Sequence, residues 1–211
     1  MLRQQINTPT LKGYEHINRY WDPRLRQPAA KILPGEAYVS KTGEVIVTVL
    51  SSCVAVCIRD TRIGVGGMSH FTVPMLSQKS SEEHARLAAE AYACWAIEQV
   101  TNEIYKQGGQ RAALEVKVYG GGPQLVAEAP DDMGARNAQF LRDYFAGEGI
   151  RPLEEGLEGD FPRKISYFPD TGATRVNDIR TRANDTIEQR EQDYNRALLR
   201  RPDLGDLELF V

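Results

Sequence analysis

The sequence predicts an α+β fold, because strand-like and helical segments follow one another without the regular β–α–β alternation of a parallel sheet. Short runs rich in β-branched residues alternate with Gly- and Pro-containing turns in the first third of the chain. Two later segments repeat apolar residues at helical spacing. The length of 211 residues, with 41% hydrophobic and 26% charged side chains, suits a soluble chain with one main core.

We divide the chain by composition. Three prolines interrupt residues 1–30, so we expect an irregular N-terminal arm whose aromatic side chains pack on the body. The main domain is expected at 31–176. Charged residues dominate from 177 to 211, which favours a charged helical tail with Asn184 or Asp185 as the helix cap.

Within the main domain, turn residues separate the expected elements. The expected strands cover residues 31–33, 37–40, 44–50, 54–58, 114–119 and 165–168, and a Gly-rich strand or turn covers 63–68. Ser80 and Glu83 form an S-x-x-E capping box before a long helix, which Gly108 ends. A second helix is expected over 134–145.

Charge and cysteine usage exclude several classes of function. The net charge of −3 gives no general attraction to nucleic acid, and no apolar run is long enough for a membrane-spanning helix. Three cysteines are too few for a disulfide framework, which favours a reducing, cytoplasmic location. The Gly-rich stretches lack phosphate-loop motifs, so we expect no nucleotide cofactor.

Cys53 and His70 are the candidates for thiol chemistry. Cys53 follows a Ser-Ser break between two strand-like runs, and His70 follows the Gly-rich segment. A thiol paired with an imidazole can become a nucleophile near neutral pH. A cysteine in apolar company is also commonly a core residue, and this is the favoured interpretation of Cys57. A zinc site at Cys53, Cys57 and His70 is disfavoured, because the fourth ligand is missing.

Several ordered motifs resemble the CheD family of chemoreceptor glutamine deamidases. They are ILPGEAYV at 32–39, TVLSSCVAVCIRD at 48–60, GVGGMSHFTVP at 64–74, KVYGGG at 117–122, GARN at 134–137 and RKI at 163–165. The resemblance runs from about residue 14 to 176, and the chain ends in a GDLELF motif found in some bacterial members.

The resemblance implies a catalytic set. The family's nucleophile falls on Cys53, its histidine on His70, and its third member on Thr48. Backbone N–H groups near Ser52 and Cys53 would stabilise the oxyanion. This chain has Ser51 where the family usually has Gly, so the turn must be one that serine can adopt. Residues 158–162 also replace a more usual Gly-Gly stretch.

The same resemblance implies packed mixed β-sheets flanked by helices, similar to the catalytic domain of the cytotoxic necrotizing factor toxins. The implied reaction converts glutamine on methyl-accepting chemotaxis receptors to glutamate, without metal or cofactor. Because a receptor presents its glutamine on a helix, we expect a shallow open site, rimmed by loops at 120–122 and 66–68. Two alternative functions remain. One is a non-catalytic adaptor, whose binding partner is either a chemoreceptor or a CheC-type response-regulator phosphatase. The other is a receptor methylesterase.

Overall fold

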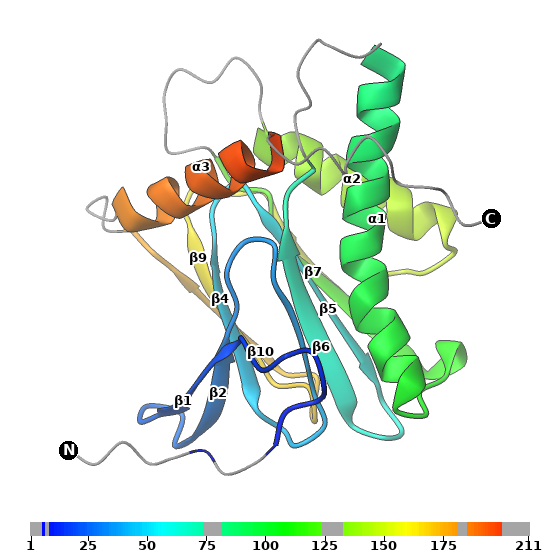
Figure 1. Cartoon of the computed structure of the whole chain (residues 1–211), viewed down its shortest axis with the longest axis vertical. Coiled ribbons are helices and arrows are strands. Elements are labelled where there is room, and N and C mark those ends of the chain that lie inside the picture. The colour runs from blue at the N-terminus through cyan, green and yellow to red at the C-terminus, as the bar shows by residue number, and fades with distance from the viewer. Residues whose placement is uncertain (1–5, 7–8, 74–81, 124–132, 181–184, 200–211) are drawn as a thin grey trace.

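The computed structural model describes residues 6, 9–73, 82–123, 133–180 and 185–199. These residues form two five-stranded sheets and three α-helices (Figure 1). The α+β class is therefore confirmed. Among the described residues, no helix is long and apolar enough to cross a membrane.

The first sheet is mixed. In spatial order it contains β1 (Asn18–Asp22), β2 (Gln27–Lys31), β4 (Val45–Leu50), β9 (Arg163–Tyr167) and β10 (Thr174–Asp178). The second sheet is also mixed. It contains β3 (Ala37–Ser40), β6 (Val65–Phe71), β5 (Val54–Asp60), β7 (Leu114–Gly120) and β8 (Glu154–Leu157).

Part of the N-terminal segment belongs to the first sheet, where the sequence had indicated irregular chain. β1 and β2 pair antiparallel, and β2 runs parallel to β4 from Ala29 onward. Pro28 is paired with Trp21 of β1, and it precedes Ala29, the first residue of β2 that pairs with β4. A proline at this point removes no hydrogen bond from the ladder with β4, so it does not break the strand.

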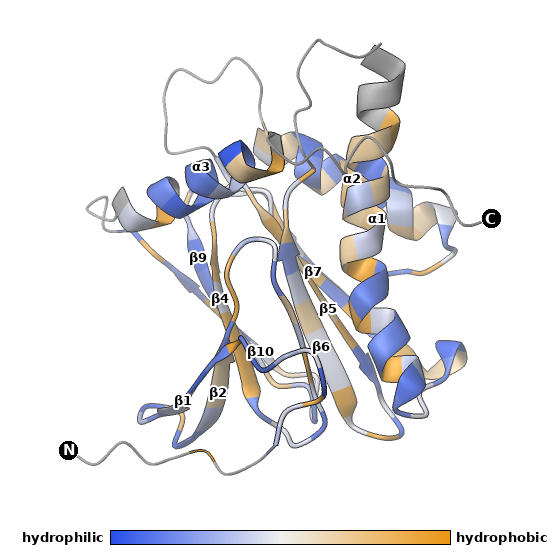
Figure 2. Ribbon diagram, viewed as in Figure 1, coloured by the Kyte–Doolittle hydropathy of each residue, from blue (hydrophilic) through white to orange (hydrophobic). Residues whose placement is uncertain are grey.

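The two faces of β5 serve two cores, which explains its almost wholly apolar sequence. Val54, Val56 and Ile58 pack toward the helices, in a core that also includes residues of α1 (Glu82–Lys106) and α2 (Met133–Gly147). Ala55 and Cys57, which alternate with them along the strand, face the core between the two sheets. A strand buried on both faces reads as a continuous apolar run (Figure 2).

The helices lie where sequence periodicity predicted them. α1 packs on β6 and β3, and α2 on β5 and β7. A Cβ at Gly67 would lie 2.9 Å from Val100 Cγ1, so this glycine allows α1 to approach the sheet. A short 3-10 turn, η1 (Arg111–Ala113), precedes β7. Ser80 of the predicted capping box lies outside the described residues.

The third helix, α3 (Asp185–Leu199), lies across one end of the sheets (Figure 1). Its inward-facing side chains Ile187, Glu191 and Leu198 are buried. They lie four and seven residues apart, the spacing of one helical face. The expected capping residue Asn184 lies outside the described residues, as does the motif at the chain end.

Candidate active site

The site forms where the chain crosses from one sheet to the other. β4 ends at Leu50 in the first sheet, and β5 begins at Val54 in the second. Residues 51–53 make the crossing and belong to neither strand. Their backbone N–H groups are therefore free of ladder hydrogen bonds and need other acceptors.

A glycine segment supports this crossing from behind. Gly121 N donates to Cys53 O at 2.9 Å, and Gly122 N donates to Ser51 O at 2.8 Å. Gly120 has φ of 108°, and a Cβ there would lie 2.2 Å from Cys53 O. Only glycine fits such a close approach of two backbones. Residues 120–122 thus lie beside Cys53, as expected, but they support the backbone of the crossing and do not line the pocket beside His70 and Thr48.

The other expected rim segment lies elsewhere. Residues 66–68 are inside β6, where Gly66 pairs with Arg59 and Met68 pairs with Cys57. These pairs lie toward the far end of β5 from Cys53. The Gly-rich run therefore serves strand pairing and helix packing, and none of its residues lines the pocket beside His70 and Thr48.

Serine is compatible with the crossing at position 51. Ser51 does not have a left-handed φ, and its Oγ donates to Pro123 O at 2.9 Å. The turn is one that an ordinary residue can adopt. The loop at 158–162 differs, because Glu158 has φ of 63° and Gly159 has φ of 92°.

Thr48 and His70 join the two sheets. Thr48 lies on β4 and His70 on β6, and Thr48 Oγ1 is 2.8 Å from His70 Nδ1. The same hydroxyl donates to Ile32 O at 2.9 Å, so its only proton is engaged. The hydroxyl must therefore accept a proton from Nδ1, and in the neutral ring this leaves Nε2 as the unprotonated nitrogen. His70 Nε2 is buried without a hydrogen-bond partner among the described residues.

Cys53 lies close to the imidazole of His70. The candidate ligand atoms of Cys53, His70 and Glu191 all lie within 4.8 Å of one another, and all three residues are buried. Burial lowers the pKa of His70 to about 3, so the ring is neutral. Burial also raises the pKa of the Cys53 thiol, and the Glu191 charge and a hydrogen bond to Glu191 raise it further. The thiol is thus held in its protonated form.

Glu191 fills the space opposite the crossing, and sequence reasoning missed it. Its Oε1 accepts from Ser51 N at 2.9 Å and from Cys53 N at 3.5 Å. Its Oε2 accepts from Ser52 N at 3.1 Å and from Ser52 Oγ at 2.7 Å. The spacing of Glu191 from Ile187 and Leu198 marks one helical face, but the high density of charge in this segment predicts a solvated helix.

Asn137 fixes the orientation of the crossing from α2. Its Nδ2 donates to Ser52 O at 2.8 Å, and its Oδ1 accepts from Val73 N at 2.8 Å. Holding the Ser52 carbonyl on this side turns the next amide, Cys53 N–H, toward the opposite side. Asn137 belongs to the GARN motif, but nothing in the local sequence indicates this positioning role.

Cys57 has the core position expected of it. It is fully buried among the inter-sheet side chains, and burial raises the pKa of its thiol. It is not part of the cluster formed by Cys53, His70 and Glu191. That cluster offers three potential metal ligands of the kinds that bind zinc, in a combination different from the disfavoured sequence pattern.

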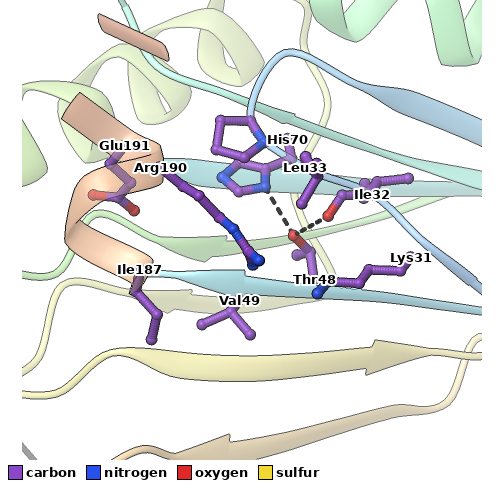
Figure 3. A pocket seen from close by; sticks show the side chains of 10 residues that line it. Lys31, Ile32, Leu33, Thr48, Val49, His70, Ile187, Arg190 and Glu191 are labelled. Carbon is purple, nitrogen blue, oxygen red and sulfur yellow. Dashed lines mark hydrogen bonds between the residues drawn. The ribbon is translucent and has the colours of Figure 1, made fainter. Parts of the chain in front are cut away.

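The site is closed in this structure, whereas an open site was expected. Cys53 has no exposed surface. The pocket beside His70 and Thr48 has a volume of about 20 Å³ and is lined on one side by Ile187, Arg190 and Glu191 of α3 (Figure 3). Such a volume is close to that of one water molecule and is too small for a glutamine side chain. Glu191 places α3 within 4.8 Å of the thiol, so this helix helps to close the site.

Comparisons with known proteins agree with one another. Residues 75–178 match a family model described as CheD chemotactic sensory transduction. A protein of Halorhodospira halophila is 44% identical over 202 residues, covering 95% of this chain and 93% of the relative. A protein of Saccharophagus degradans is 39% identical, covering 96% and 94%. Both relatives bear the name probable chemoreceptor glutamine deamidase CheD.

A structural comparison adds nothing to this. The Bacillus licheniformis hypothetical protein YfiH is 12% identical with a TM-score of 0.32, and the match covers 57% of this chain and 49% of that one. A score this low supports no argument about fold or function.

Proposed function

Because this chain belongs to the CheD family, we propose that it is a glutamine deamidase acting on methyl-accepting chemotaxis receptors. One observation of the structure carries the proposal. The Cys53 thiol lies within 4.8 Å of a ring nitrogen of the neutral His70 and of the Glu191 carboxylate, which the backbone N–H groups of Ser51 and Ser52 already bind. Amide hydrolysis by a thiol needs both a base and an oxyanion site.

Cys53 is the proposed nucleophile. His70 Nε2 accepts the thiol proton as Sγ attacks the carboxamide carbon of the substrate glutamine. The oxyanion forms where N–H groups converge, and the structure adds Ser51 N–H to those of Ser52 and Cys53. Each such donor contributes most when it is held in place before the reaction, as Asn137 does here for the Ser52–Cys53 peptide.

His70 then acts as an acid. It donates its proton to the leaving nitrogen, which departs as ammonia and leaves a thioester on Cys53. A water molecule, deprotonated by the same Nε2, attacks the thioester and releases glutamate and the free thiol. Thr48 is a positioning residue, because its hydroxyl holds Nδ1–H and so keeps Nε2 available.

The test uses a receptor cytoplasmic fragment and peptide mass spectrometry. Wild-type protein should convert specific glutamines to glutamate, and Cys53→Ala should not. Cys57→Ala is the matched control, because it removes a buried thiol that lies outside the cluster and should leave turnover intact. Conversion by Cys53→Ala, or its loss only in Cys57→Ala, would overturn the assignment.

The remaining expectations belong to this proposal. We place the enzyme in the cytoplasm and expect packed sheets similar to the cytotoxic necrotizing factor catalytic domain. A CheC-type phosphatase is a proposed partner. An adaptor function would be supported by tight binding of receptor or phosphatase without any conversion. Methylesterase activity would appear as hydrolysis of a glutamyl methyl ester in the same assay.

A further inference from the structure

Glu191 of α3 is bound at the candidate active site, although no step of the deamidase mechanism involves it. The carboxylate is engaged by Ser51 N, Ser52 N and Ser52 Oγ, three donors on the crossing, at 2.7 to 3.1 Å. The imidazole of His70 is held instead through Nδ1, by Thr48. Glu191 therefore does not orient the imidazole, as the acidic member of a catalytic triad would.

The chemistry of this contact matches the product of the proposed reaction. Deamidation converts a glutamine on a helix into a glutamate on a helix, and it leaves that carboxylate against the thiol and the oxyanion donors. Glu191 is a glutamate on a helix, and its carboxylate lies against the same thiol and the same donors.

Resting on the proposed function, we propose that α3 occupies the docking surface of the substrate helix and places Glu191 as a built-in product analogue. The surface for the receptor is then the one that α3 covers. Lys31 and Thr48 lie on it (Figure 3), and the crossing meets it through the hydrogen bonds to Glu191. Receptor access requires α3 to leave. The helix thereby inhibits its own enzyme until a substrate helix replaces it.

The contacts of α3 fit a segment that can dock and release. Ile187 and Leu198 bury apolar side chains at its two ends, and Tyr194 forms a hydrogen bond with Tyr92 of α1. Most of its other described side chains are exposed and charged or polar. Arg190 and Lys31 line the same pocket; burial lowers the pKa of Lys31, and the like charge of Arg190 lowers it further.

One substitution tests the position of residue 191 directly. Glu191→Gln turns the product analogue into a substrate, so the full-length variant should deamidate itself. The reaction consumes one water molecule, releases ammonia and converts the introduced glutamine to glutamate. Peptide mass spectrometry detects this change of mass at position 191. Gln189 of the same helix is the internal control and should remain glutamine, because its side chain is exposed and donates to Asp193. The double variant Cys53→Ala/Glu191→Gln should keep the introduced glutamine unchanged.

A second variant tests inhibition. Glu191→Ala removes the charge-assisted hydrogen bonds that hold the closed state, so alkylation of Cys53 and receptor turnover should rise roughly tenfold or more. Gln189→Ala on the exposed face is the matched control and should change neither rate. Thermal unfolding establishes that each variant is folded.

The outcomes separate the inference from the proposed function. If the Glu191→Gln variant deamidates the receptor but leaves its own introduced glutamine unchanged, the inference alone is overturned. Loss of receptor turnover in a folded Glu191→Ala variant would also overturn it, and would make Glu191 part of the catalytic machinery. Failure of wild-type protein to convert any receptor glutamine would count against the function itself.

Discussion

The hydroxyl of Thr48 offers a sharp test of how the imidazole is held. It is 1% exposed, donates to Ile32 O at 2.9 Å and accepts from His70 Nδ1 at 2.8 Å. Thr48→Val preserves the shape of the side chain and removes both hydrogen bonds. Each buried group left unpaired costs about 1–3 kcal/mol, so the free energy of unfolding should fall by about 2–6 kcal/mol.

The effect on turnover follows from the same geometry. Without the hydroxyl, the proton is no longer held on Nδ1 and the ring is no longer fixed toward Cys53. A loss of about 1–3 kcal/mol of transition-state stabilisation corresponds to a drop of roughly five- to 150-fold in kcat/KM. The assay is receptor deamidation below the unfolding temperature of the variant, followed by mass spectrometry.

Thr48→Ser is the matched control. It keeps the hydroxyl and loses one buried methyl group, which costs about 1 kcal/mol of stability. Its turnover should stay within about twofold of wild type, since the hydrogen bonds remain. Equal turnover in the folded Val and Ser variants would refute the idea that this hydroxyl positions His70.

Three further predictions concern neighbouring residues. Because the pKa of His70 falls from 6.5 to about 3 on folding, the unfolded state binds more protons in this range. The free energy of unfolding, measured in urea, should therefore decline as the pH falls from 6.5 toward 3, by up to about 1.4 kcal/mol per pH unit. The His70→Gln variant should lose this pH dependence, and His16→Gln, at an exposed position, should keep it. Asn137→Asp cannot donate to Ser52 O and should lower kcat about tenfold or more; unchanged kcat in the folded variant would contradict its positioning role. Elemental analysis of purified protein should find zinc well below one equivalent, and stoichiometric zinc released on Cys53→Ala would contradict a free thiol.

The sequence predicts those strands and helices that have a clear hydrophobic pattern within their own residues. β5 begins with a continuous apolar run over residues 54–58, and α2 repeats apolar residues at Ala138, Leu141 and Phe145. Both occur within a few residues of the expected bounds. Periodicity succeeds here because each element buries a face that its own residues define.

The strands that were missed depend on their neighbours. β1 and β2 contain proline and polar residues, and β8 and β10 are short and largely exposed. Each is extended because it adds to a sheet whose other strands come from distant parts of the chain. A strand that forms mainly by pairing with neighbouring strands need not show a strand-like pattern in its own sequence.

The residues of the candidate active site also fall into two groups, those that local motifs predict and one that comes from a distant part of the chain. Cys53, His70 and Thr48 lie within 23 consecutive residues and carry recognisable motifs. Glu191 meets Ser51 across 140 positions of sequence, so no local pattern could connect them. The Glu191 carboxylate is buried because α3 packs against the crossing, a tertiary contact that the charged local sequence does not encode.

The placement of Thr48 and His70 on different sheets has a consequence for biosynthesis. Both residues are made early, yet β4 needs β9 as its antiparallel neighbour, and the crossing needs Asn137 and the glycines after β7. A nascent chain therefore carries all the reacting groups long before it can align them. We expect activity during refolding to appear no earlier than the pairing of β4 with β9, so that the enzyme completes its sheets before it can modify any partner.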